Sequence, residues 1–355
     1  MKRTSFIATH PLIVFGLSTV LFAAVMPSGN SADARSIAPD VSTAASASSL
    51  QVPEAIVRDI KTGYFHRAAS SLEPMMPTHA GDPDYPYRYA QALHGAGRTD
   101  KALTAIKAAI ALAPQTAVYH RLMGEVYGVL AKNAGIFHAL GLAKHALAEF
   151  RMAVKLDPQD PQSLADLAAY YFGAPWIAGG STEKAHAIET ALDKLNPLDA
   201  LQVRAQEARR AKDYAQAEIL LKQAARLDKT SDSLTTLAFF YLSKGRYADA
   251  FPIFQAITAK TPNNAQAWYW IGRTADLTHS HYADGIAALK HYIALPERPD
   301  GVPSLAFAHL RLGDLYLLAD RKDMARTEYA EAQKAGGAND KQFKSELKKS
   351  LNKLR

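Results

Sequence analysis

Apolar and polar positions follow one another with the period of an α-helix along most of this chain. The clearest stretch, residues 231–264, carries two apolar faces. Leu234, Leu237, Ala238 and Tyr241 form the first face, and Tyr247, Ala250, Phe254 and Ile257 form the second. Gly245 lies between them and provides the backbone freedom that a tight turn needs, while Pro262 ends the second helix. The stretch therefore predicts two short amphipathic helices joined by a turn.

Related copies of this unit fill the chain from about residue 49 to residue 337. The next copy carries Trp268, Ile271 and Gly272 in its first half and Gly285, Leu289, Tyr292 and Pro296 in its second. A further copy carries His309, Leu312, Gly313 and Tyr316, followed by Ala325, Tyr329 and Ala332. This order of large, small and aromatic residues resembles the tetratricopeptide repeat. Because one helix pair cannot bury its apolar face alone, several copies in phase predict stacked pairs.

The resemblance implies an all-α fold, a right-handed α-solenoid of about eight helix-turn-helix units over residues 52–337 with a C-terminal capping helix over residues 338–355. Two units depart from the regular pattern. The third holds extra residues near 129–142, and the turn of the fourth is lengthened around 174–180. Insertions on one set of loops often build a binding face, so both are candidates for specificity.

The beginning of the chain predicts a secretory signal peptide over residues 1–34. Lys2 and Arg3 precede an apolar run, and a small-x-small cleavage site ends at Ala34. An uncleaved membrane anchor is the competing interpretation, but the run of about 15 apolar residues is shorter than the roughly 20 that span a bilayer. Residues 35–51 are small and polar and predict a flexible linker. The chain has no cysteine, which excludes disulfides and, with export, favours a bacterial periplasm.

The tail combines an apolar face with a basic one. The whole chain has a formal net charge of +7, and most of this excess lies in residues 338–355, which hold six Lys or Arg against two acidic residues. Phe343, Leu347, Ser350, Leu351 and Leu354 recur there at helical spacing. This pattern is typical of a capping helix that covers the last repeat. Contact with acidic membrane lipids is a second interpretation of the lysines. Nucleic acid is not an expected partner of an exported protein.

Two motifs have the spacing of catalytic or nucleotide-binding loops. Ser181 and Lys184 are spaced like a serine nucleophile and its lysine base. They stand where a helix begins and have no partner motif, so Ser181 is expected to cap that helix. Gly95 and Gly97 lack a third glycine and follow a helix, which predicts a helix turn and not a nucleotide loop.

Two histidine motifs could be taken for metal ligands. His279 and His281 lie two residues apart in a turn, without a third and fourth ligand nearby. His145 and Glu149 lie four apart and are expected to form a surface pair on one helix. We therefore expect no catalytic residues, no cofactor and no metal.

The resemblance also implies where a partner binds. In the family the first helices of the units line a concave groove that holds peptides or partner helices. The positions that face this groove correspond here to Tyr87, Arg121, Arg204, Phe239, Tyr269 and Arg273. Trp176, in the lengthened turn, is expected either to dock on a neighbouring helix or to contact a partner. Aromatic residues and arginines often dominate the energy of interfaces.

The sequence thus predicts a non-enzymatic scaffold of the cell envelope that binds a partner protein or peptide. The alternative is a small-ligand-binding accessory protein of a transporter or envelope-assembly system. A third class, a hydrolase or metalloenzyme, would use Ser181, His279 or His281.

Overall fold

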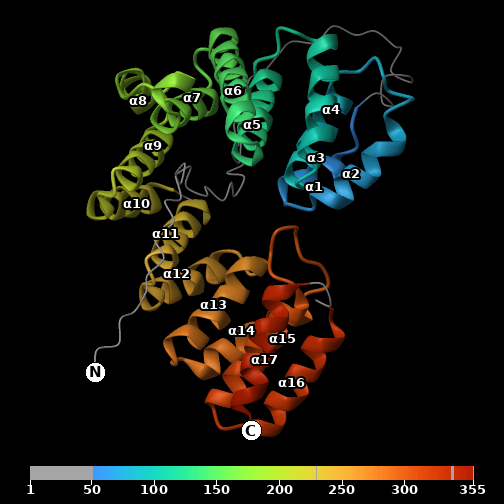
Figure 1. Ribbon diagram of the computed structural model, residues 1–355, viewed down its shortest axis with the longest axis vertical. Helices are drawn as coiled ribbons and strands as arrows, with labels where there is room; N and C mark the ends of the chain where they lie inside the picture. The colour runs from blue at the N-terminus through green and yellow to red at the C-terminus, as the bar shows by residue number, and fades with distance from the viewer. Residues whose placement is uncertain (1–50, 229, 337–339, 355) are drawn as a thin grey trace, which may run out of the picture.

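The computed structural model describes residues 51–228, 230–336 and 340–354, and these residues form an all-helical array (Figure 1). The predicted signal peptide and residues 35–50 of the predicted linker lie outside them. In the described residues the α-helices pair in sequence order and end with one further helix. The first four pairs are α1 Glu54–Lys61 and α2 Phe65–Leu72, α3 Asp84–Gly95 and α4 Thr99–Leu112, α5 Ala117–Asn133 and α6 Ile136–Leu156, and α7 Pro161–Gly173 and α8 Thr182–Leu195. The next four are α9 Pro197–Arg210 and α10 Tyr214–Leu227, α11 Asp232–Ser243 and α12 Tyr247–Lys260, α13 Ala265–Thr278 and α14 Tyr282–Ala294, and α15 Leu305–Leu318 and α16 Lys322–Lys334, before α17 Lys341–Lys353.

The prediction of about eight helix pairs and a final helix is confirmed. Each helix from α1 to α16 packs on its neighbours in the sequence, and α17 packs on α15. The first helices of several successive pairs also touch, as α7 and α9 or α13 and α15 do. Short 3-10 turns follow α2, over Glu73–Met75, and α7, over Trp176–Ala178. Within the described part of the chain, no helix combines the length and the apolar character that crossing a membrane requires.

Small residues on first helices meet large residues on second helices, which fixes the geometry of each pair. A Cβ atom placed on Gly313 would lie 2.5 Å from the ring of Tyr329, and one placed on Gly124 would lie 2.7 Å from the ring of Phe150. The two helices of a pair can approach closely only because these side chains are absent. The turn glycine Gly245 has φ +67°, the left-handed conformation that glycine adopts without strain.

The insertion in the third unit lengthens helices and does not form a loop. The helices α5 and α6 have 17 and 21 residues and are the longest of the described helices, with the turn at Ala134 and Gly135. The insertion in the fourth unit forms the 3-10 turn Trp176–Ala178, after which Gly179 has φ +91°.

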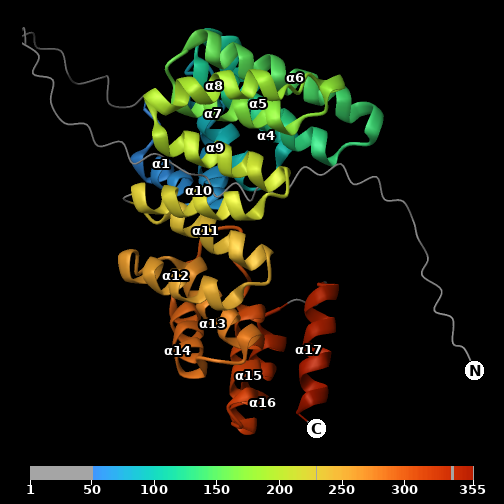
Figure 2. The same ribbon diagram turned by 90° about the vertical axis from the view of Figure 1, so that its left-hand side faces the viewer.

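The helix α17 covers the end of the array with Phe343, Leu347 and Leu354, which are buried as predicted. Leu351, which the sequence pattern placed on the same face, is exposed. Figure 2 shows α17 standing beside α15 and α16.

The array turns back on itself, so that the first pair touches the loop between α14 and α15. Figure 1 shows this loop rising toward α1 and α2. The backbone N–H of Asp300 donates to the carbonyl of Gly63 at 2.9 Å, and the Asp300 carboxylate accepts from the backbone N–H of His66 at 2.8 Å. Arg67 adds an ion pair with Glu297 at 2.7 Å. We call these contacts between residues 63–67 and 297–300 the closure contact.

Candidate functional site

The aromatic residues predicted to face the groove pack against other aromatic side chains of the protein. Tyr87 and Tyr269 are buried, with exposed fractions of 7% and 5%. Tyr87 packs against Tyr119, with ring centroids 4.7 Å apart, and Tyr269 packs against Tyr292 at 5.6 Å. Phe239 is partly buried between aromatic rings of its own and the next pair. Tyr87 and Phe239 thus join one helix pair to the next, and Tyr269 joins the two helices of its own pair. The role of these three residues in partner binding stays a prediction.

The three predicted arginines are each held by carboxylates. Arg121 on α5 pairs with Glu125 at 2.6 Å and reaches Asp166 on α7 at 3.3 Å. Arg204 on α9 pairs with Asp193 on α8, and Arg273 pairs with Asp276 on its own helix. The guanidinium groups are thus oriented before any partner arrives, which lowers the entropy that binding through them would cost. No comparison tests whether they bind a partner.

Burial perturbs the acids around Arg121. The pKa of Asp166 is raised because the carboxyl is removed from water and lies near Glu125, and the attraction of Arg121 only partly offsets this. Burial also raises the pKa of Glu125. Two carboxyl groups thus share one guanidinium on adjacent first helices.

A polar pocket of about 240 Å³ lies between α13, α15 and α17. Arg311 lines this pocket, where its guanidinium donates to Asp314 at 3.0 Å and forms an ion pair with Glu346 of α17. Tyr329 donates its hydroxyl to the other oxygen of Asp314 at 3.0 Å. Lys349 and Lys353 bring basic groups of α17 to the pocket wall. The mixed charges suit polar peptide groups more than an apolar ligand.

Both predicted insertions expose large apolar side chains. Ile136 and Phe137 begin α6 with exposed fractions of 60% and 93%, and Trp176 and Ile177 in the 3-10 turn have 84% and 45%. The hydroxyl of Tyr170 donates to the carbonyls of Ala143 on α6 and Ala178 in the turn, at 2.7 and 2.9 Å. The turn is therefore fastened to α6, the helix that carries the other exposed pair. We call Ile136, Phe137, Trp176 and Ile177 the insertion surface.

Of the two outcomes expected for Trp176, the structure shows exposure and not docking on a neighbouring helix. This arrangement leaves a large aromatic ring in water although the segment around it is held in place. Such a residue has the properties of an interface anchor.

The motifs with catalytic spacing have structural roles. Ser181 caps α8 and accepts from the backbone N–H of Lys184 at 3.3 Å, as predicted. Gly95 is the last residue of α3, and Gly97 follows it in the turn with φ +73°. His281 stacks on Phe251 with centroids 4.4 Å apart.

The predicted surface pair of His145 and Glu149 was wrong. Glu149 instead bonds to Nδ1 of His120 on α5 at 2.7 Å, while His145 stacks on Tyr127. Both residues face α5 because the lengthened α6 packs along it, a contact that the spacing within one helix does not reveal.

Sequence reasoning missed two groups of residues. The closure contact has a weak signal, because the segment from Pro296 to Ser304 is longer than most of the other links between units and contains three prolines and a glycine. The second group is His186, Glu189 and Glu207 on α8 and α9, which lie close together in space. Their spacing along the chain matches no metal or catalytic motif.

Residues 60–126 and 208–274 match the family model "Tetratricopeptide repeat". No curated protein matches the sequence. Among solved structures, the chain is similar to a tetratricopeptide repeat protein from Parabacteroides merdae, with 19% identity over 76% of this chain and 99% of that chain and a TM-score of 0.39.

Two further structures are similar at the same level. A thermophilic tetratricopeptide repeat protein of Thermus thermophilus shares 20% identity over 64% of this chain and 96% of its own, with a TM-score of 0.39. The Pseudomonas aeruginosa protein pilF shares 14% identity over 72% of this chain and 92% of its own, with a TM-score of 0.41.

Proposed function

Because the chain carries tetratricopeptide repeats, we propose that it is a non-enzymatic scaffold of the cell envelope that binds a partner protein or peptide. Stacked helix pairs offer an extended surface, and the described side chains supply ion-paired arginines and exposed aromatic groups along it. The observation that carries the proposal is the insertion surface. Both places where the chain departs from its regular repeat expose large apolar residues, and both lie on or against α6.

The location in the envelope rests on the predicted signal peptide. Export followed by cleavage after Ala34 would leave a chain that begins near Arg35. Expression of the full-length gene in a bacterial host, followed by osmotic shock, tests this directly. We expect the released protein to have the intact mass of residues 35–355, and a cytoplasmic protein of full mass would refute the envelope assignment.

Partner binding is tested by recovering partners from the envelope fraction on the immobilised protein. We compare the wild type with the double variant Phe137→Ala/Trp176→Ala, because exposed aromatic anchors typically contribute about 2 kcal/mol or more each to binding. The control is Ile219→Ala/Leu227→Ala, which removes two exposed apolar side chains from α10, outside the insertions. We expect the first variant to lose the partner and the control to retain it.

The groove is tested separately with Arg273→Ala, since truncation of the buried Tyr269 would report on stability instead. Retention of the partner by Arg273→Ala, together with its loss from the insertion variant, would place recognition on the insertion surface. Equal recovery by the wild type and all three variants would refute the proposal.

A further inference from the structure

The apolar core is thinnest where α8 meets α9. One large cluster of buried apolar residues ends at Ala185, and the next begins at Ala205. Only a small cluster lies between them: Leu164, Ala168, Leu192, Ala200 and Val203. The helix α9 is also among the most polar in the array. Apolar burial therefore contributes less to the junction of the fourth and fifth pairs than to its neighbours.

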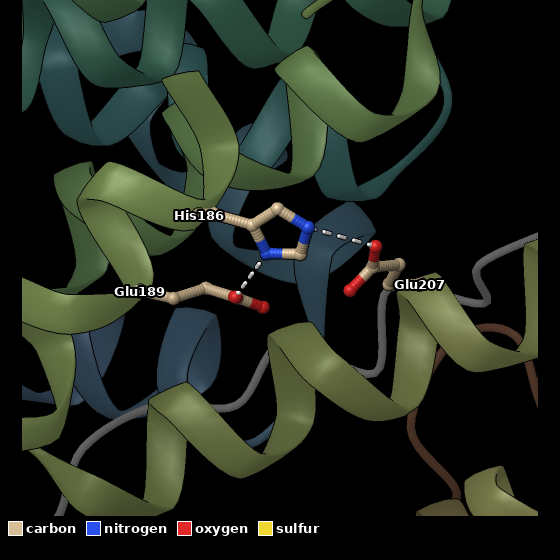
Figure 3. Close-up of side chains that lie close together, drawn as sticks. All are labelled: His186, Glu189 and Glu207. Carbon is tan, nitrogen blue, oxygen red and sulfur yellow. Dashed lines mark hydrogen bonds and ion pairs between the residues drawn. The ribbon is translucent and has the colours of Figure 1, made fainter. Parts of the chain in front are cut away.

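A compact polar cluster bridges this junction. The Nδ1 atom of His186 lies 2.8 Å from Oε2 of Glu189, one turn further along α8. Its Nε2 atom lies 3.4 Å from Oε1 of Glu207, which comes from α9. Figure 3 shows the imidazole between the two carboxylates, with each ring nitrogen directed at one of them. One potential ligand atom from each of the three residues lies within 4.8 Å of the others.

The buried member of this cluster is incompletely satisfied. The Glu189 side chain is 6% exposed, and its Oε1 atom has no hydrogen-bond partner among the described residues. A buried carboxylate oxygen without a partner is destabilising. In Figure 3 this carboxylate points across the cluster toward Glu207 and not into the body of the helix. Arg204, one turn before Glu207, is already engaged by Asp193. The Oε1 atom of Glu189, which has no partner among the described residues, thus faces a space next to a second carboxylate, where a cation would be stabilised.

We propose that His186, Glu189 and Glu207 form a binding site for a divalent transition-metal ion, with zinc as the best match to one imidazole and two carboxylates. The separation of 3.4 Å between His186 Nε2 and Glu207 Oε1 fits an ion about 2.1 Å from each, because the angle at the ion is then about 108°, close to tetrahedral. The 2.8 Å contact of Nδ1 with Glu189 lies at the opposite edge of the imidazole, so this hydrogen bond has to break before Glu189 can reach the same ion.

The free oxygen of Glu189 supplies the third ligand. Three ligands of a tetrahedral zinc ion are about 3.4 Å from one another, whereas one ligand atom from each of these residues now lies within 4.8 Å of the others, so they have to approach by up to about 1.4 Å. The His186 and Glu207 side chains, which are 52% and 31% exposed, have room to make this movement toward the buried Glu189. The fourth position remains open to water or to a donor group of a partner. The ion would link α8 to α9 where the apolar core is thinnest.

The test is a titration of the purified, metal-free chain with zinc chloride against a chromophoric chelator. We expect one ion per chain at high affinity. His186→Ala and Glu207→Gln should each weaken the binding of that ion at least about tenfold, since even outer-shell substitutions typically reduce metal affinity by about 10–100-fold. Cobalt should give the intense visible absorption of a four-coordinate site in the wild type and not in His186→Ala.

The matched control is His281→Ala. It removes a histidine of similar exposure that lies 3.8 Å from Asp284, without a second carboxylate in its pair. This control should bind zinc as the wild type does. Far-UV circular dichroism verifies that each variant is folded, and Glu207→Gln changes only one partly exposed group. Equal zinc affinity of the wild type, His186→Ala and Glu207→Gln would show adventitious binding by surface histidines and overturn the proposal.

Discussion

Substitution of Gly313 by alanine isolates the small-against-large pairing that holds each helix pair together. Gly313 lies within α15, where an alanine would ordinarily stabilise the helix by about 1 kcal/mol. Here the new methyl group would lie 2.5 and 2.6 Å from two ring atoms of Tyr329. Contacts this short force the ring or the helix to move.

The ring has little freedom to move. Tyr329 is 1% exposed, and its hydroxyl donates to Asp314, which also accepts from Arg311 at 3.0 Å. Overpacking of this kind typically costs about 1–3 kcal/mol, and displacement of the hydroxyl from a buried carboxylate adds about 1–3 kcal/mol. After the gain in helix propensity of about 1 kcal/mol, we expect Gly313→Ala to lower the free energy of unfolding by about 1–5 kcal/mol.

Urea unfolding followed by circular dichroism measures this change, and Gly141→Ala is its control. Gly141 is an exposed glycine inside α6, and a Cβ atom placed on it would meet nothing within 4 Å. This substitution should raise the free energy of unfolding by up to about 1 kcal/mol. If the two substitutions change stability in the same direction and by the same amount, the close contact between Gly313 and Tyr329 does not determine the packing of the pair.

Three further predictions concern other parts of the array. Asp300→Ala removes the carboxylate that accepts a hydrogen bond from the backbone N–H of His66. Loss of one such bond, worth about 1 kcal/mol, should speed hydrogen exchange of that amide about fivefold. Unchanged exchange would contradict the closure contact in solution. Burial raises the pKa of Asp199 to about 6, so its carboxyl binds a proton more tightly in the folded chain than in the unfolded one. The stability that this proton binding contributes is complete below about pH 4 and is lost as the pH rises to about 6. Asp199→Asn should therefore gain stability relative to the wild type between pH 4 and pH 7 in urea titrations, and a constant difference across this range would be evidence against the shift. Ser181→Ala should lower the free energy of unfolding by about 1 kcal/mol by removing the cap of α8, whereas Ser181→Gly should cost only a few tenths, and equal losses would exclude the capping role.

The helix pairs could be predicted because their determinants are local and recur. The spacing of Gly313 and Tyr329 repeats that of Gly272 and Leu289 closely enough to identify the unit from the sequence. The lengthening of α5 and α6 could not be predicted as helical, because an insertion of alanines and leucines around Gly135 is compatible with either a loop or a longer helix.

The candidate sites depend on contacts between residues on different helices, and no local sequence pattern predicts these contacts. Tyr87 and Tyr269 have the residue type and position of groove contacts, but each meets an aromatic ring on another helix and is buried. The cluster of His186 and Glu207 brings together residues from two helices with no motif between them. The sequence left open whether Trp176 docks on a neighbouring helix or is exposed to a partner, because only the backbone path of the turn decides this. The structure shows it exposed.

The closure contact changes how this array can lose its structure. In an open stack the terminal units have a neighbour on one side only, so they fray first and the loss proceeds inward from either end. Here the Gly63 and His66 backbone groups are held by a segment more than two hundred positions further along the chain. Separation of the first pair therefore disturbs the seventh and eighth pairs as well, which couples the two ends of the molecule and makes its melting more cooperative than that of a linear row of repeats.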